Sequence, residues 1–271
     1  MRGSSRAAAR AAEEALDTSL QGGADATTQA EELFAVTAVV DGSASLRRAL
    51  ADPSREAADK GALATSVFGG KVSASAADLV AAVAQQRWAD ERDLTDTIES
   101  LAVQSLLASA ESRGRIDRVE DELFRFERIV AGDAGLRDAL SSRNSDGPGK
   151  AALVHELLEG KAAPETARLA EQAVRSPRGR RLDRVLESYL QLAARRREQL
   201  TALVTVASAL SEQQQARLRT ALESHYGKAV VIQEVHDPVV LGGIRVQVGD
   251  DVVDGTVLRR LEEARRHVTG G

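Results

Sequence analysis

The chain has 271 residues, of which 43% are hydrophobic, so it is long enough for about two domains and can bury a substantial core. Its 41 acidic and 36 basic residues give a net charge of -5, which provides no general attraction to nucleic acid or anionic lipid. The absence of cysteine excludes disulfides, thiolate metal sites and a cysteine nucleophile. Aromatic residues are only 3%, so the core must consist mainly of Ala, Leu and Val, which suits closely packed helices.

The N-terminal segment contains Arg2, Arg6 and Arg10, but its apolar residues are nearly all alanine and are interrupted by Glu13 and Glu14. It lacks the continuous apolar stretch of a signal peptide. No apolar run elsewhere approaches the roughly 20 residues that cross a bilayer. We therefore expect a protein of the cytoplasm without direct membrane insertion, whose association with a membrane depends on a partner.

The first clear helix signal lies between residues 28 and 40, where Leu33, Phe34 and Val40 share one apolar face. Thr28 stands three residues before an acid, which predicts a capping box with Thr28 as the N-cap. Glycines that follow apolar residues at Gly70 and Gly160 predict the ends of two further helices. Trp88, the only tryptophan, is expected in the core.

An internal repeat is the most informative feature of the chain. Residues 32–50 recur 90 residues later as residues 122–140, with identical residues at ten of the nineteen aligned positions. The same offset relates Gly70-Lys71 to Gly160-Lys161. A constant offset of this kind indicates duplication of a structural unit.

The repeat predicts a mainly α fold with two tandem homologous helical bundles of about five or six helices each. Extending the offset backward makes the end of the first copy overlap the start of the second. We predict copy 1 over residues 1–112, copy 2 over residues 91–199, and one long helix over about residues 90–113 that both copies share.

Two short features could indicate chemistry. Asp146–Ala151 resembles a phosphate-binding loop, but it lacks the first glycine and the hydroxyl residue after Lys150, and it follows a helix. We expect an ordinary loop between helices there. The histidines have no partner at metal-ligand spacing, and we expect no metal, no cofactor, no catalytic residue and no enzyme activity. These isolated histidines are His155, His225, His236 and His267.

Arginines are concentrated between Arg175 and Arg197, where eight of them accompany only two acids, Asp183 and Glu187. A groove for nucleic acid would normally add stacking aromatic side chains, and Tyr189 is the only aromatic residue here. The composition favours a solvated or protein-facing basic surface and no nucleic-acid partner. An Arg-rich nucleic-acid-binding protein remains the less favoured alternative.

Residues 200–271 have a different pattern, which predicts a small α/β module. Alternating β-branched residues predict strands, Ser211 to Gln214 has capping-box spacing before a helix that ends at Gly227, and residues 249–251 predict a turn. The expected strands are Leu200–Ala207, Ala229–Val235 and Ile244–Val248, and the expected final helix is Val257–Val268.

The segment from Ser208 to Ala264 resembles the C-terminal signature of the delta subunit of F-type ATP synthase, the oligomycin-sensitivity-conferring protein family. Upstream, Arg180-Arg181-Leu182 also fits this family. The resemblance differs in one respect, because the usual member has a single N-terminal helical domain. The signature positions are Gly227, Asp237, Gly242, Gly243, Gly249, Asp250, Asp254 and Gly255.

The resemblance implies a non-catalytic peripheral-stalk (stator) subunit, held at the cytoplasmic side of the cell membrane through the ATP synthase complex. It implies that a helical domain binds the N-terminal segments of the alpha subunits of the catalytic head. The C-terminal module is expected to bind the far end of the b-type stalk. An unrelated helical scaffold or adaptor is the alternative, and the sequence leaves open which helical copy contacts the head.

Overall fold

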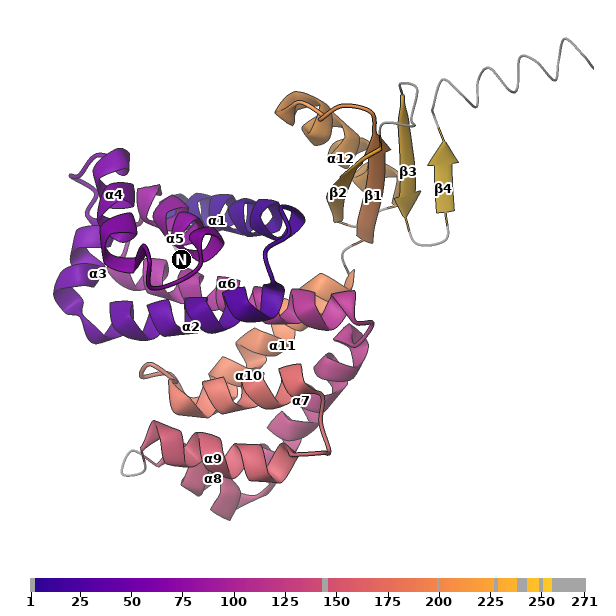
Figure 1. Ribbon diagram of the computed structural model, residues 1–271. Helices are drawn as coiled ribbons and strands as arrows, with labels where there is room; N and C mark the ends of the chain where they lie inside the picture. The colour runs from indigo at the N-terminus through magenta and orange to yellow at the C-terminus, as the bar shows by residue number, and fades with distance from the viewer. Residues whose placement is uncertain are drawn as a thin grey trace, which may run out of the picture. The chain divides into compact units, whose positions relative to one another are not determined.

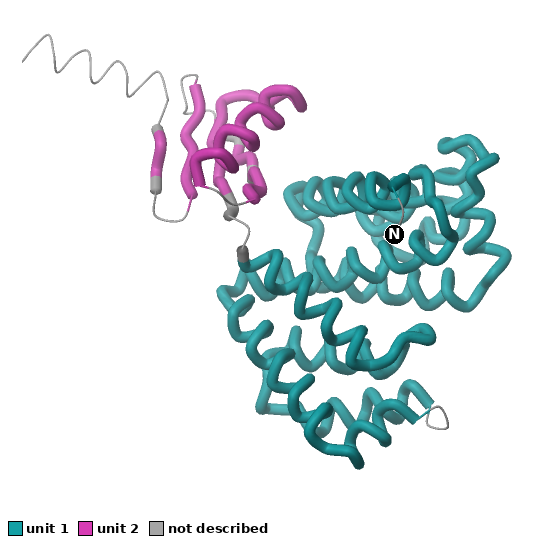
Figure 2. Tube along the Cα trace, turned by 180° about the vertical axis from the view of Figure 1, so that it is seen from behind, with its two compact units in different colours: residues 1–197 teal, residues 198–271 magenta. Residues whose placement is uncertain are grey.

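A computed structural model describes residues 3–142, 146–198, 200–226, 229–237, 243–248 and 251–254. In these ranges the chain forms helices up to residue 198 and then a small sheet with one helix (Figure 1). The predicted fold class, mainly α with a small C-terminal α/β module, is confirmed. The chain divides into two compact units, residues 1–197 and residues 198–271 (Figure 2).

The helical unit consists of helices joined by short turns, whose apolar faces form one continuous core. The helices are α1 (Gly3–Gln21), α2 (Ala26–Gly42), α3 (Ala44–Ala51), α4 (Ala57–Phe68), α5 (Ala74–Gln85), α6 (Glu91–Ser112), α7 (Ile116–Gly132), α8 (Ala134–Ser141), α9 (Gly147–Leu158), α10 (Pro164–Arg175) and α11 (Leu182–Glu198).

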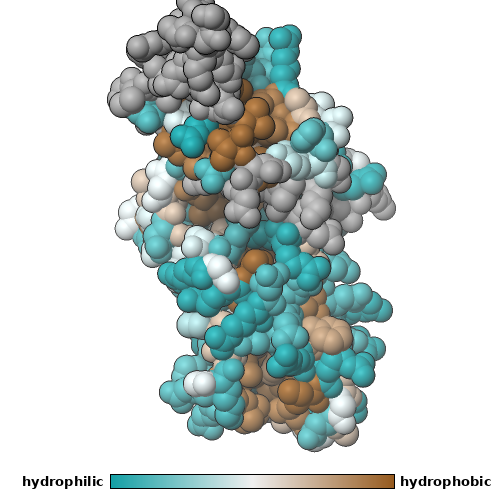
Figure 3. Space-filling view, turned by 90° about the vertical axis from the view of Figure 1, so that its right-hand side faces the viewer, coloured by the Kyte–Doolittle hydropathy of each residue, from teal (hydrophilic) through white to brown (hydrophobic). Residues whose placement is uncertain are grey.

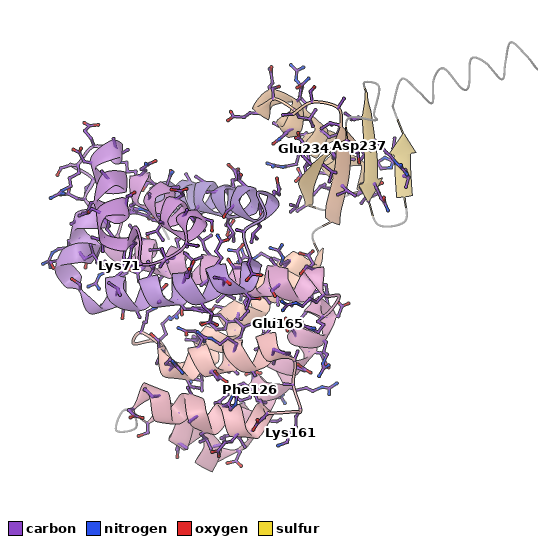
Figure 4. All side chains as sticks on the ribbon, in the orientation of Figure 1. Lys71, Phe126, Lys161, Glu165, Glu234 and Asp237 are labelled. Atoms are coloured by element: carbon purple, nitrogen blue, oxygen red, sulfur yellow. The ribbon has the colours of Figure 1, made fainter. Side chains whose placement is uncertain are left out.

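Helices α2 to α5, which we call the first set, match helices α7 to α10, the second set. Each helix of the second set begins 90 residues after its counterpart and has the same length: 17, 8, 12 and 12 residues in chain order. The turns agree as well, because Gly70 and Gly160 both adopt positive φ, at 73° and 68°, just after α4 and α9. Figure 4 labels the lysines that follow them, Lys71 and Lys161.

Helix α6 packs against helices on both sides of it in the sequence: α1, α2, α3 and α5 before it, and α7 and α10 after it. Its buried residues run from Leu94 to Ala110 and lie on most of its circumference, as expected for a helix that neighbours surround. The segment predicted as shared is thus one 22-residue helix. The division of the chain into two copies at this helix stays a prediction.

Two local predictions in the helical unit are wrong. The N-cap of α2 is Asp25, whose carboxylate accepts a hydrogen bond from the Thr28 N–H at 2.7 Å, so the helix begins before Thr28. The phosphate-loop-like segment is no loop, because α9 begins at Gly147 and Asp146 caps it through the Gly149 N–H. A proline in the first turn is compatible with this start, since its missing N–H would be unpaired there. Trp88 is buried, as predicted.

The second unit is a four-stranded sheet in the order β2-β1-β3-β4, with helix α12 packed on it. Strands β1 and β2 are parallel, and the other two pairings are antiparallel. Alternate residues of β1, namely Ala202, Val204 and Val206, are buried in a separate small core. The elements are β1 (Leu200–Val206), α12 (Glu212–Tyr226), β2 (Val230–His236), β3 (Ile244–Val248) and β4 (Asp251–Asp254).

The three predicted strands are confirmed, and so is the capping box of α12. The Ser211 N–H donates to Gln214 Oε1 at 2.9 Å, and the Gln214 N–H donates to Ser211 Oγ at 3.3 Å. Asp251 was expected in a turn, but it begins β4, a strand that sequence analysis missed. The predicted helix Val257–Val268 lies outside the described residues.

Candidate interaction surfaces

A buried charge cluster lies where α6 meets the end of α10 and the start of α11. Its centre is Glu99 of α6, whose carboxylate accepts hydrogen bonds from Arg178, from Arg180 at 2.6 and 2.7 Å, and from the Tyr189 hydroxyl at 3.0 Å. Glu99 and Arg178 both have side chains only 3% exposed. Burying a carboxylate is costly unless it is paired and fully hydrogen-bonded, and this arrangement provides both.

Arg178 extends the cluster to other helices. Its guanidinium lies 2.6 Å from Asp96 of α6 and 3.9 Å from Asp41 of α2. Burial by itself would lower the pKa of Arg178, but the charges of Glu99 and Asp96 outweigh it and raise the pKa above its usual value. Arg178 also has φ of 52°, a strained conformation for a residue with a side chain, and its ion pairs hold it there.

Tyr189 of α11 completes the cluster from the other side. Burial, reinforced by the nearby charge of Glu99, raises its pKa well above the usual value. The phenol therefore stays protonated at neutral pH and can only donate to Glu99 in this pair. The cluster ties α11 and the loop before it to α6 and α2, so these helices are held as one rigid piece.

Most of the Arg-rich stretch is neutralised inside the chain. Six of its eight arginines lie within ion-pair distance of an acid, and four of these six pair with acids from outside the stretch, which its composition alone does not count. Arg196 pairs with Glu111 at 2.7 Å, for example, and Arg197 with Glu120 at 3.0 Å. The paired residues are Arg178, Arg180, Arg181, Arg184, Arg196 and Arg197.

Corresponding glutamates anchor the start of α5 and of α10. Glu32 of α2 accepts hydrogen bonds from the Ser73 N–H at 2.9 Å and the Ser73 hydroxyl at 2.5 Å. Glu122 of α7 accepts them from the Ala163 N–H at 2.8 Å and the Thr166 hydroxyl at 2.7 Å. In each set a carboxylate thus satisfies an N–H group at the N-terminus of a neighbouring helix, where the helix dipole favours negative charge.

Glu165, in the first turn of α10, joins this helix to the turn between α6 and α7 (Figure 4). Its side chain is 2% exposed and accepts hydrogen bonds from Arg113 at 2.9 Å and from Arg115 at 2.5 Å. Burial by itself would raise the pKa of Glu165, but the hydrogen bonds from these arginines outweigh it and hold the pKa below its usual value.

The described residues contain no group of three or more His, Cys, Asp or Glu side chains that could hold a metal ion. His155, one of the isolated histidines, pairs with Glu171 at 2.9 Å, and that hydrogen bond raises its pKa. None of the described helices is long and apolar enough to cross a bilayer.

Comparison with known proteins decides the family. Residues 98–268 match the family described as ATP synthase delta (OSCP) subunit. A protein named ATP synthase subunit delta from Kineococcus radiotolerans is 46% identical over 269 residues, which are 99% of this chain and 98% of the relative. The chain belongs to the ATP synthase delta (OSCP) subunit family.

Further relatives agree over the full length. The ATP synthase subunit delta of Streptomyces griseus is 45% identical over 271 residues, all of both chains. Among solved structures, a chain of the mitochondrial ATP synthase hexamer of Toxoplasma gondii covers 62% of this chain and 94% of its own, at 15% identity and a TM-score of 0.29. The identity to the Kineococcus and Streptomyces proteins spans both helix sets as well as residues 208–264.

The structure brings three of the delta-family signature positions to one edge of the sheet. Asp237 directly follows β2, and its N–H donates to the Val206 carbonyl at 3.0 Å (Figure 4). Gly243, with φ of 84°, directly precedes β3, and Asp254 ends β4 opposite Arg245. Strands β1 and β2 are parallel, and β3 is antiparallel to both β1 and β4. The ends of β2 and β4 and the start of β3 therefore lie on the same side of the sheet. The other five, Gly227, Gly242, Gly249, Asp250 and Gly255, lie outside the described residues.

Sequence reasoning did not find Glu99 or Glu165. A signal for Glu99 was present, because it is an acid within a segment whose other residues, such as Ile98 and Leu101, are apolar or small. An acid inside a buried helix requires a cationic partner. The partners themselves come from residues 79 to 90 positions away, which no local pattern reveals.

Proposed function

We propose that this chain is a non-catalytic peripheral-stalk subunit of the F-type ATP synthase, which links the catalytic head to the membrane-anchored b-type stalk. The observation that carries the proposal is the 45–46% identity, over the whole chain, to proteins named ATP synthase subunit delta. The subunit makes and breaks no bonds. It keeps the head from turning with the central rotor, so that rotation drives ATP synthesis.

A stator must transmit force without yielding, and the helical unit is built accordingly. Helix α6 contacts helices before and after it, and the Glu99 cluster fixes α11 to it by charge-assisted hydrogen bonds. Packed helices of this kind resist shear because their side chains interdigitate at crystal-like density. These features support a load-transmitting role and require no cofactor.

The proposed division of labour follows the two units. The helical unit, with copy 1 over residues 1–112 and copy 2 over residues 91–199, binds the N-terminal segments of the alpha subunits. The C-terminal module, residues 200–271, binds the end of the b-type stalk. Grooves between helices suit amphipathic partner helices. The complex then holds the protein at the cytoplasmic side of the membrane without insertion.

Co-purification tests the proposal most directly. The tagged full-length chain, expressed in its own cells, is expected to bring down the head subunits and the b-type stalk together. Cells that lack the chain are expected to lose proton-driven ATP formation while the detached head still hydrolyses ATP. Fully coupled ATP formation in those cells would refute the proposal.

The division of labour has its own test. Deletion of residues 200–271 is expected to abolish binding to a peptide from the b-type stalk and to leave binding to the purified head measurable. The helical unit has its own core, separate from that of the sheet, so it is expected to stay folded. Equal loss of both interactions would contradict the assignment of one partner to each unit.

A further inference from the structure

An arginine of the second helix set covers a phenylalanine of the first. The guanidinium carbon of Arg168, on α10, lies 4.7 Å from the centre of the Phe34 ring on α2. The same guanidinium makes two parallel hydrogen bonds to Glu31, at 2.6 and 2.8 Å. One arginine thus stacks on a ring and pairs with a carboxylate three residues before it, a combination that Arg favours through its flat, forked shape.

An acid and a phenylalanine recur at the corresponding positions of α7, where nothing described covers the ring. Asp121 stands where Glu31 stands, and Phe124 stands where Phe34 stands. Phe34 is 4% exposed, whereas Phe124 is 53% exposed. Their neighbours Leu33 and Leu123 are equally buried, so the two helices have the same orientation toward the core. The exposure of the Phe124 ring is therefore not caused by a rotation or distortion of α7.

Phe124 belongs to a groove between α7 and α11, a cavity of about 560 Å³. Leu190 and Ala194 of α11 line it together with Phe124. Its charged lining residues are four acids and one arginine, and two of the acids pair within the chain, Glu120 with Arg197 at 3.0 Å and Glu187 with Arg184 at 2.7 Å. These charged residues are Asp117, Glu120, Asp121, Glu187 and Arg197.

The acid beside Phe124 is available to a partner. Asp121 pairs with Arg125 one turn away at 2.6 Å, but both side chains are more than half exposed. Exposed pairs at this spacing contribute little to stability and exchange readily. An incoming guanidinium that also stacks on Phe124 would gain a second interaction that Arg125 does not make with that ring in the structure.

We propose that the groove between α7 and α11 binds a basic amphipathic helix of another subunit of the complex, with one arginine stacked on Phe124 and paired with Asp121. The inference rests on the proposed function, because that function supplies the complex from which the partner comes. The stacking of Arg168 on Phe34 shows how an arginine binds the corresponding site of the first set. The excess of acids over arginines in the groove favours a basic helix. Apolar residues of the partner would lie along Leu190 and Ala194.

Other apolar side chains reach the surface of the helical unit, notably Ile129 of α7 and Leu157 of α9. Figure 3 shows apolar surface at the end of this unit where α8 and α9 lie. For these side chains, no equivalent residue of the first helix set is described in contact with a covering group, so nothing indicates what would bind them. Ile129, at 59% exposure, is for that reason the matched control for Phe124.

Photocrosslinking in the purified, assembled complex tests the proposal. A benzophenone amino acid placed at position 124 of the full-length chain is expected to crosslink to a helix of another subunit, beside an arginine or lysine. The same group at position 34 should crosslink within the chain, to α10, and serves as the positive control. Crosslinks from position 124 to residues 200–271, crosslinks to a second copy of this chain, or the absence of crosslinks would overturn the inference.

Rebinding of the purified chain to complex depleted of it gives the size of the effect. Phe124→Ala and Asp121→Lys are each expected to weaken binding by about tenfold or more, as at a docking anchor. Phe124→Trp should keep binding within about threefold, because it preserves the stacking surface, and Ile129→Ala within about twofold. Equal binding by all four variants would overturn the inference while leaving the stator function intact. Absence of the chain from the complex would refute both.

Discussion

The two helix sets have the same helices at the same spacing, yet the residue that closes each set differs completely. Three residues after α5 stands Trp88, which is 3% exposed and donates its indole N–H to the Val83 carbonyl at 2.9 Å. Three residues after α10 stands Arg178, whose side chain is buried and bonded to acids of α6. After the first set, the buried Trp88 bonds to α5 of the same set. After the second set, the buried side chain of Arg178 instead forms ion pairs with α6.

The difference shows how two repeated helix sets can be joined into one rigid unit. Buried charges seek partners, and here the partners of the second set lie on α6 and α2. A second buried tryptophan would stabilise its own set as well, but it would add no directional bond between the sets. Because replacing a buried ion pair by apolar residues is often neutral for stability, we expect the main contribution of these pairs to be the fixed arrangement of the helices.

Removing the centre of the charge cluster has the largest expected effect. Glu99→Ala leaves Arg178 buried without its main counter-charge, and we expect a loss of about 3–5 kcal/mol in the free energy of unfolding. Denaturant unfolding followed by the fluorescence of Trp88 measures it. Because Trp88 directly follows the first set and donates its N–H to Val83 of α5, a shift in its transition would show that the two sets unfold together.

The control for that variant is Glu187→Ala on α11. Glu187 is 51% exposed and pairs with Arg184 at the surface, so its removal should cost less than about 0.5 kcal/mol. If both variants had the same small effect, the Glu99 cluster would not hold the sets together.

An intermediate effect is expected from Glu165→Gln, which removes a charge that pairs with Arg113 and Arg115 of the turn between α6 and α7. We expect a loss of about 2 kcal/mol at pH 7. Since the pKa of Glu165 is lower in the folded chain than its usual value of 4.5, its stabilisation is present above that pH and disappears as the pH falls below it. Urea titrations at pH 7 and pH 3 should therefore give a large and then a small difference from the unaltered chain. A constant difference would contradict the assignment.

The smallest effects concern matched caps. Ser43 caps α3 and Asp133 caps α8 at corresponding positions, through the Leu46 and Leu136 N–H groups at 3.3 and 2.9 Å. We expect Ser43→Ala and Asp133→Ala each to cost about 1 kcal/mol. Native-state hydrogen exchange should show the loss in α3 for the first variant and in α8 for the second. Exchange that rises equally in both helices would mean that the two sets open together.

Sequence by itself determined what depends on near neighbours. The apolar periodicity, the capping box of α12 and the glycines after α4 and α9 act over a few residues, and the repeat carried them into both sets. The same local logic failed at Asp25, where a better-placed cap preceded Thr28, and at β4, which is a strand only because β3 lies beside it.

Tertiary structure decided which of two similar residues is covered. Phe34 and Phe124 follow the same Glu/Leu pattern on helices of equal length, yet one ring lies beneath Arg168 and the other faces outward. The partners of the buried Glu99, Arg178 and Tyr189, are likewise brought to it only by the fold. Burial and pairing are set by residues distant in the chain, and no local pattern contains that information.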